Sequence, residues 1–130
     1  MLRDHRILNP ALLRALASAG HTDLVVVADA GLPIPAGVPL IDLSLTPGVP
    51  SFAAVLETVL ASLTVDEVVI AAQSADSPAD ATLKRLCADL PTRTVDHEEL
   101  KALSRRAHVI VRTGECTPYA NAVLVAGVTF

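Results

Sequence analysis

Apolar side chains recur along the chain with two different spacings, and each spacing predicts a different element. Between residues 52 and 63 they return every three or four positions, which places them on one face of a helix. Elsewhere they form short unbroken runs, which are typical of strands buried on both faces of a sheet. The helical stripe consists of Phe52, Val55, Leu56, Val59, Leu60 and Leu63, and strands are predicted at 23–28, 68–72, 109–111 and 122–125.

Residues that begin and end helices lie between these runs. Asn9 can accept a hydrogen bond from the first free amides, and Pro10 suits the first helical position, so a helix is predicted to begin there. Leu12 and Leu16 share its inner face. Gly20 is expected to end this helix in a left-handed turn.

Two further helices are predicted in the second half of the chain. Ser77 and Pro78 open the first of them. Asp96 caps the second, with Glu99 three residues later as a capping-box partner, and His97 takes its first position. The remaining predictions are short strands at 40–43 and 93–95, a turn at 46–48, and inward-facing side chains at Leu83, Leu86, Cys87 and Leu90.

Strands that alternate with helices predict an α/β fold. Because several strands are solidly apolar, we expect a three-layer sandwich, a mostly parallel sheet with helices on both faces, in a single domain over residues 1–130. Ligands of such sheets bind beyond the carboxyl ends of the strands. Asp29, the loop after Ala72, the helix start at 96–97 and the loop 112–121 are all predicted to lie at that edge.

Composition adds an expectation about assembly. The chain of 130 residues is 52% hydrophobic, 18% charged and only 2% aromatic, so its core must be aliphatic. A small domain cannot bury that much apolar side chain alone, which favours an oligomer. The net charge of −4 and the absence of a basic stripe argue against nucleic-acid binding, and no apolar run is long enough for membrane insertion. Cys87 and Cys116 are interpreted as free thiols in a reducing cytoplasm.

Motifs for common cofactors are missing from the sequence, so neither a cofactor nor a metal is expected. Glycines do not form GxGxxG, no GxSxG elbow is present, and histidines and carboxylates lack zinc-ligand spacing. His97 and Lys101 lie four residues apart on one helix face, and the helix dipole favours a neutral imidazole at the helix start. From the pattern alone, this pair is either a sugar-binding pair or an ordinary solvated helix start.

The loop 112–121 is polar between apolar strands. Tyr119 is the chain's only tyrosine, and its ring can stack on a sugar while its hydroxyl bonds to it. Asn121 offers a donor and an acceptor to a diol. The alternative is a packed loop anchored by the tyrosine. Glu115 is either a solvated carboxylate or a group behind the site.

Six segments together resemble the D-ribose pyranase family, within the ribose and fucose mutarotase superfamily. The resemblance implies a cytoplasmic isomerase of ribose catabolism that interconverts β-D-ribopyranose and β-D-ribofuranose without a cofactor, as a ring-shaped homo-oligomer, with a decamer as one form. It implies a catalytic acid at His21 and substrate-binding roles for His97, Lys101, Tyr119 and Asn121. Asp29 is expected either to orient the histidine or to bind the hydroxyls of the substrate. The segments are 21–35, 41–45, 48–52, 97–101, 112–121 and 126–130.

Alternatives to this function remain open. The sibling L-fucose mutarotase shares the early histidine and the terminal loop, and a non-catalytic ribose-binding subunit of a transport system would bind ribose without speeding ring exchange. The segment 73–90 lacks close likeness to the family, which leaves the pocket rim there undefined. His5 and His108 match no family site residue and are interpreted as structural.

The spacing of His21 and Asp29 raises a geometric problem. They flank one predicted strand, and five or six residues at about 3.3 Å each separate them by roughly 15–20 Å. A ribose is far smaller than that. Either the ends of the strand fold back, or the pocket lies between subunits. The apolar surplus favours the second solution.

Overall fold

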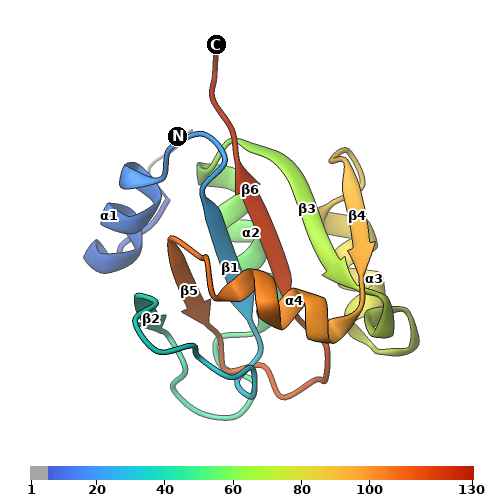
Figure 1. Cartoon of the computed structure of the whole chain (residues 1–130). Coiled ribbons are helices and arrows are strands. Elements are labelled where there is room, and N and C mark those ends of the chain that lie inside the picture. The colour runs from blue at the N-terminus through green and yellow to red at the C-terminus, as the bar shows by residue number, and fades with distance from the viewer. Residues whose placement is uncertain (1–5) are drawn as a thin grey trace.

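The computed structural model describes residues 6–130, so His5 lies outside the described residues. A six-stranded sheet runs through this part of the chain, in the order β2-β5-β1-β6-β3-β4 (Figure 1). β6 is antiparallel to its neighbours β1 and β3, and the other pairings are parallel, which confirms a mostly parallel sheet. The strands are β1 (Leu24–Ala28), β2 (Leu40–Asp42), β3 (Val65–Ala71), β4 (Thr92–Val95), β5 (Val109–Arg112) and β6 (Ala122–Ala126).

Helices cover both faces of the sheet, as the sequence predicts. Alternate residues of β1 point to opposite faces, so Val25 and Val27 join a core cluster with α1, α2 and α3, whereas Val26 joins another with Leu100 of α4. Figure 1 shows α4 in front of the sheet and α2 behind it. The helices are α1 (Pro10–Ser18), α2 (Phe52–Ser62), α3 (Ala79–Leu86) and α4 (His97–Ser104), and the 3-10 helix η1 spans Ala72–Asp76.

The start of α1 is confirmed, but its predicted end is wrong. Asn9 accepts a hydrogen bond from the Leu12 N–H at 2.9 Å. The cap residue at the other end, Ala19, is extended, and the left-handed backbone occurs later, at Thr22 with φ 73°. The reason is that the Asp23 carboxylate accepts the Gly20 N–H at 2.8 Å, which satisfies this amide without a left-handed glycine.

The start of α4 also differs from the prediction. Asp96 caps it as expected, but its side chain accepts from Glu98. The other contact to the helix start comes from Gln73, whose Oε1 accepts the His97 N–H at 3.0 Å, rather than from Glu99. The capping box is therefore replaced by a residue from η1, an element that the sequence did not predict.

Several smaller differences concern the borders of elements. β3 begins at Val65, three residues before the predicted start. α3 begins at Ala79, whose N–H donates to the Ser77 hydroxyl. The predicted turn is present, with Gly48 in the left-handed region at φ 82°. Within residues 6–130, no helix combines the length and the apolar character that a membrane crossing requires.

Candidate functional site

A cavity of about 620 Å³ opens at the edge of the sheet where β1, β4 and β5 end. This is the edge at which the sequence predicted a ligand site, because carboxyl ends of parallel strands meet there. Four of the expected site residues line it together, although they come from three separate segments of the chain. The lining consists of residues 29–33, His97, Lys101 and residues 115–119.

Asp29 is fixed at the base of the cavity by Asn121. Asp29 is 8% exposed and Asn121 is fully buried. The Asn121 amide donates to Asp29 Oδ2 at 3.0 Å, and its oxygen accepts the Asp29 backbone N–H at 2.9 Å. The other carboxylate oxygen accepts the Gly31 N–H at 2.9 Å. Asn121 thus lies behind Asp29 and outside the cavity lining, so its expected direct contact with a sugar stays a prediction.

His97 and Tyr119 form one wall of the cavity. Their rings meet edge to face, with centroids 5.1 Å apart and planes at 84°. Tyr119 has a left-handed backbone, with φ 63°, which is uncommon for a bulky residue. Nδ1 of His97 is buried, and no group of residues 6–130 forms a hydrogen bond with it. Packing and the backbone therefore hold this imidazole in place, rather than a bond to Nδ1.

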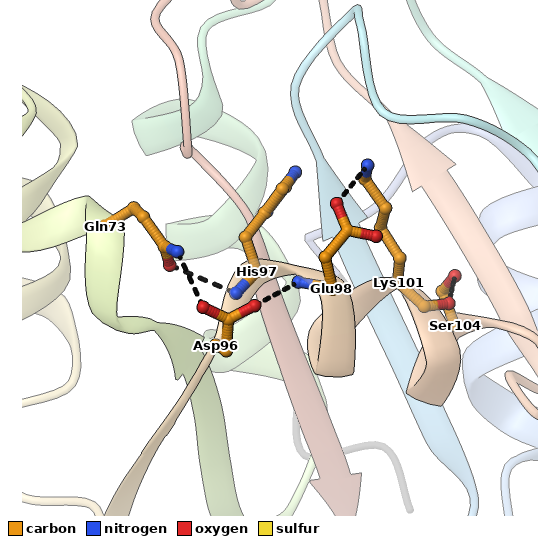
Figure 2. A network of polar contacts seen from close by, with 6 residues as sticks. All are labelled: Gln73, Asp96, His97, Glu98, Lys101 and Ser104. Atoms are coloured by element: carbon orange, nitrogen blue, oxygen red, sulfur yellow. Dashed lines mark hydrogen bonds and ion pairs between the residues drawn. The ribbon is translucent and has the colours of Figure 1, made fainter.

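Lys101 follows His97 by one helical turn, and both side chains rise from the same side of α4 (Figure 2). This confirms that the two residues share a helix face. Lys101 Nζ donates to Glu98 Oε1 at 2.9 Å, and the lysine side chain is 33% exposed while Glu98 is 77% exposed. The ammonium group is thus at the rim of the cavity, within reach of a ligand and of solvent.

Glu115 organises the loop that carries Tyr119. Its carboxylate accepts bonds from the Thr117 hydroxyl at 2.8 Å and from the Phe52 N–H at 3.1 Å, the first amide of α2. Burial alone would raise the pKa of Glu115, but hydrogen bonds from Thr117 and Phe52 outweigh it and hold the pKa below its usual value. Sequence reasoning left this role undecided, because Phe52 lies 63 positions away and no local pattern links the two.

His21 lies at the opposite end of β1 and does not line the cavity. Its Nε2 is 3.1 Å from Asp66 Oδ2, and its side chain is 59% exposed. A β-carbon on Gly127 would lie 2.1 Å from Asp66 Oδ1, so a larger residue there would displace the carboxylate that His21 contacts. Within one chain, β1 stays an ordinary strand between His21 and Asp29. The ends therefore do not fold back toward each other.

The remaining described histidine, His108, binds α1. Its Nε2 lies 3.1 Å from the Ala15 carbonyl oxygen and 3.0 Å from the Ser18 hydroxyl, in agreement with a structural role. Among residues 6–130, no group of three or more histidine, cysteine or acidic side chains is arranged to hold a metal ion.

Comparison with known proteins identifies the family of the chain. A model of the RbsD/FucU transport protein family matches residues 2–129. The chain belongs to the RbsD/FucU family. This confirms the resemblance carried by the six sequence segments.

Relatives in this family share about half of the chain's residues over nearly the full length. A D-ribose pyranase of Symbiobacterium thermophilum is 54% identical, over 99% of this chain and all of the relative. A D-ribose pyranase of Pseudomonas putida is 50% identical over the same shares.

Solved structures of the family have the same fold. Bacillus subtilis RbsD, complexed with D-ribose, is 44% identical with a TM-score of 0.93, covering 99% of this chain and 100% of the other. The fucose mutarotase of Streptococcus pneumoniae, in complex with L-fucose, has a TM-score of 0.81 at 23% identity, with 95% of each chain covered. The second likeness shows the shared fold.

Proposed function

We propose that this protein is a D-ribose pyranase, an intramolecular isomerase that interconverts β-D-ribopyranose and β-D-ribofuranose. The single observation that carries the proposal is the convergence of Asp29, His97, Lys101 and Tyr119 on one cavity at the carboxyl edge of the sheet. Carboxylate, imidazole, ammonium and phenol are groups that bind sugar hydroxyls and move protons. Relatives that are 50–54% identical over 99% of this chain bear the same name.

The reaction exchanges one C1–oxygen bond of the sugar for another, and each step is accompanied by proton transfers. Ring opening breaks the bond between C1 and the ring oxygen; that oxygen gains a proton while the C1 hydroxyl loses one, and the open-chain aldehyde forms. Closure joins the C4 hydroxyl oxygen to C1; this hydroxyl loses its proton and the aldehyde oxygen gains one. Because no electrons are exchanged, positioned acids and bases suffice, and they contribute typically about 10²–10⁴-fold.

His21 serves as the catalytic acid in this proposal, supplied by a neighbouring copy of the chain. An imidazole can both give and take a proton near neutral pH. His21 is exposed, and its Nε2 lies 3.1 Å from Asp66 Oδ2, at the edge of the sheet opposite the cavity. In a ring-shaped homo-oligomer, of which a decamer is one form, the His21 edge of one copy meets the cavity of the next. Asp29 orients groups in that cavity, and His97, Lys101 and Tyr119 hold the sugar, while Asn121 fixes Asp29 from behind.

Exchange of ribose followed by saturation-transfer NMR tests the activity. The protein should accelerate pyranose–furanose exchange of D-ribose well above the rate in buffer, and act far less on L-fucose. Faster exchange of fucose alone would make the protein a fucose mutarotase. Binding of ribose without faster exchange would make it a ribose-binding subunit of a transport system, the function that the family description suggests.

Mixing two inactive variants tests whether the site is shared. Copies carrying His21→Ala and copies carrying Asp29→Asn are each expected to be inactive. Unfolded together and refolded, they should regain activity, because about a quarter of shared sites would receive both native residues in a random ring. An unmixed stock of each variant is the control. If the mixture stays inactive while oligomers form, both residues act within one chain or His21 does not act at all.

We also place the protein in the cytoplasm. Cys87 is buried and Cys116 is exposed, and both are free thiols. Free thiols, one of them at the rim of a solvent-open cavity, suit a reducing compartment.

A further inference from the structure

The side chain of Gln73 connects η1 to the beginning of α4 through both ends of its amide. Its Oε1 accepts the His97 N–H at 3.0 Å, and its Nε2 donates to Asp96 Oδ2 at 3.0 Å (Figure 2). The other Asp96 oxygen accepts the Glu98 N–H at 2.9 Å. The first turn of α4 is therefore held from outside the helix at two neighbouring residues.

The chemistry of these contacts requires both a donor and an acceptor in the side chain at position 73. The bond from the Glu98 N–H, and then the bond from Gln73, lower the pKa of Asp96, so this side chain is a carboxylate that can only accept. The His97 N–H can only donate. A residue between them must offer one donor and one acceptor, which glutamine does. A glutamate would face Asp96 with a second negative charge, and an alanine would leave both groups without this partner.

The same segment also holds the other side of the cavity wall. Ser77 follows η1, and its hydroxyl donates to the Pro118 carbonyl oxygen at 2.7 Å. Pro118 precedes Tyr119, whose left-handed backbone depends on its surroundings to persist. Residues 73–77 thus bind the segment of His97 at one end and the segment of Tyr119 at the other. We call residues 73–77 the brace.

His97 depends on this kind of support because its ring has no other polar anchor at Nδ1. That atom is buried without a partner, and the ring is placed by its backbone and by the edge-to-face contact with Tyr119. A shift of the first turn of α4, or of the loop at Pro118, would therefore separate the two rings. Displacements of this size matter in active sites, where about 1 Å can cost 10²-fold in rate.

We propose that Gln73 and Ser77 are positioning residues that set the geometry of the His97–Tyr119 pair. The part of this inference that concerns catalysis rests on the proposed ribose pyranase function. The part that concerns ring geometry does not. The inference comes from the contacts of this chain alone.

Two alanine variants and one variant that introduces a negative charge test the brace in the full-length protein. Gln73→Ala and Ser77→Ala should each lower kcat/KM for ribose exchange about tenfold through misplaced binding groups. Gln73→Glu should be equally impaired, because its carboxylate faces Asp96. Adding Asp96→Ser should restore activity, since a serine hydroxyl can donate to Glu at 73 and still cap the Glu98 N–H.

Fluorescence of Tyr119 reports the ring geometry directly. The chain contains one tyrosine and no tryptophan, so its intrinsic emission comes from Tyr119 alone. Emission should change in Gln73→Ala, Ser77→Ala and Gln73→Glu, and return in the double variant. Thr92→Ala is the matched control, because it removes a hydroxyl that donates to the Leu90 carbonyl at 3.1 Å, away from the cavity. That variant should keep both the activity and the emission.

The possible outcomes separate the brace from the function. Wild-type emission and kcat/KM in both alanine variants would overturn the brace. Loss of activity that Asp96→Ser does not restore, with unchanged emission, would assign Gln73 a merely structural role and also overturn it. If the wild-type protein does not accelerate ribose exchange, the proposed function fails, and the emission series alone decides the brace.

Discussion

At the carboxyl end of β1, Asp29 is 8% exposed and each of its carboxylate oxygens accepts a hydrogen bond within the chain. At the other end, the His21 side chain is 59% exposed and its Nε2 lies 3.1 Å from the half-exposed Asp66. The carboxyl end of β1 is therefore buried and hydrogen-bonded within the chain, whereas the other end exposes an imidazole to solvent or to another molecule. A residue whose carboxylate oxygens are hydrogen-bonded within the chain, as in Asp29, supports both the fold and the site. A residue that is exposed can be functionally essential at almost no cost to stability.

Substitution of His21 gives the sharpest separation of activity from stability. His21→Ala should abolish ribose exchange, a loss of about 10²–10⁴-fold for a positioned acid. Because the side chain is exposed, the free energy of unfolding should change by less than about 0.5 kcal/mol. Exchange NMR and thermal unfolding by circular dichroism measure the two quantities. Normal exchange in a folded variant would remove His21 from the mechanism.

Asn121 should behave in the opposite way, because its loss affects both quantities. Asn121→Ala leaves the Asp29 backbone N–H without its partner and removes a donor from the carboxylate. The free energy of unfolding should fall by about 1–3 kcal/mol, the cost of an unsatisfied buried group. Exchange should weaken as Asp29 loses its fixed orientation.

A matched asparagine elsewhere supplies the control for Asn121. Asn9→Ala removes the cap of α1, where the Leu12 N–H donates to it at 2.9 Å, far along the chain from the cavity. It should cost about 1 kcal/mol of stability and leave exchange unchanged. Equal loss of exchange in both variants would mean that Asn121 acts only through stability.

The same contrast explains how much the sequence reveals. The helical stripe of α2 and the apolar runs of the sheet are local patterns, and they predict the layers and the edge where Asp29, His97 and Tyr119 meet. Other contacts join distant parts of the chain, and no periodic pattern in the sequence predicts them. They are those of Gln73, Ser77 and Glu115, whose partners lie 24, 41 and 63 positions away. The prediction of a left-handed turn at Gly20 was wrong because the Gly20 N–H donates to the nearby Asp23 carboxylate. The role proposed for His21 requires a second copy of the chain, and no local pattern in the sequence can place that copy.

The loop carboxylate Glu115, which also lines the cavity, is expected to make the stability of the protein depend on pH. Its pKa lies below the usual 4.5, so in the unfolded chain it binds a proton more readily than in the fold. Its stabilising contribution is therefore complete above about pH 4.5 and is lost as the pH falls through the folded-state pKa. Glu115→Gln turns an NH₂ group toward a donor that the carboxylate satisfied. The variant should melt below the wild type at pH 7, and the two melting temperatures should converge in acid.

The smallest effect is expected at the rim, where Glu98 accepts from Lys101 at 2.9 Å but is 77% exposed. Exposed pairs within a helix are worth about 0.3–0.5 kcal/mol, so Glu98→Gln should barely change the melting temperature. If Lys101 reaches the sugar directly, releasing it from Glu98 should alter the KM for ribose by no more than about twofold, a difference below 0.5 kcal/mol. Lys101→Met should raise the KM much more, because it removes the ammonium donor itself. A large and equal rise of the KM in both variants would mean that Glu98 holds Lys101 in place. Lys101 would then resemble Asp29, which the chain itself positions, rather than the exposed His21.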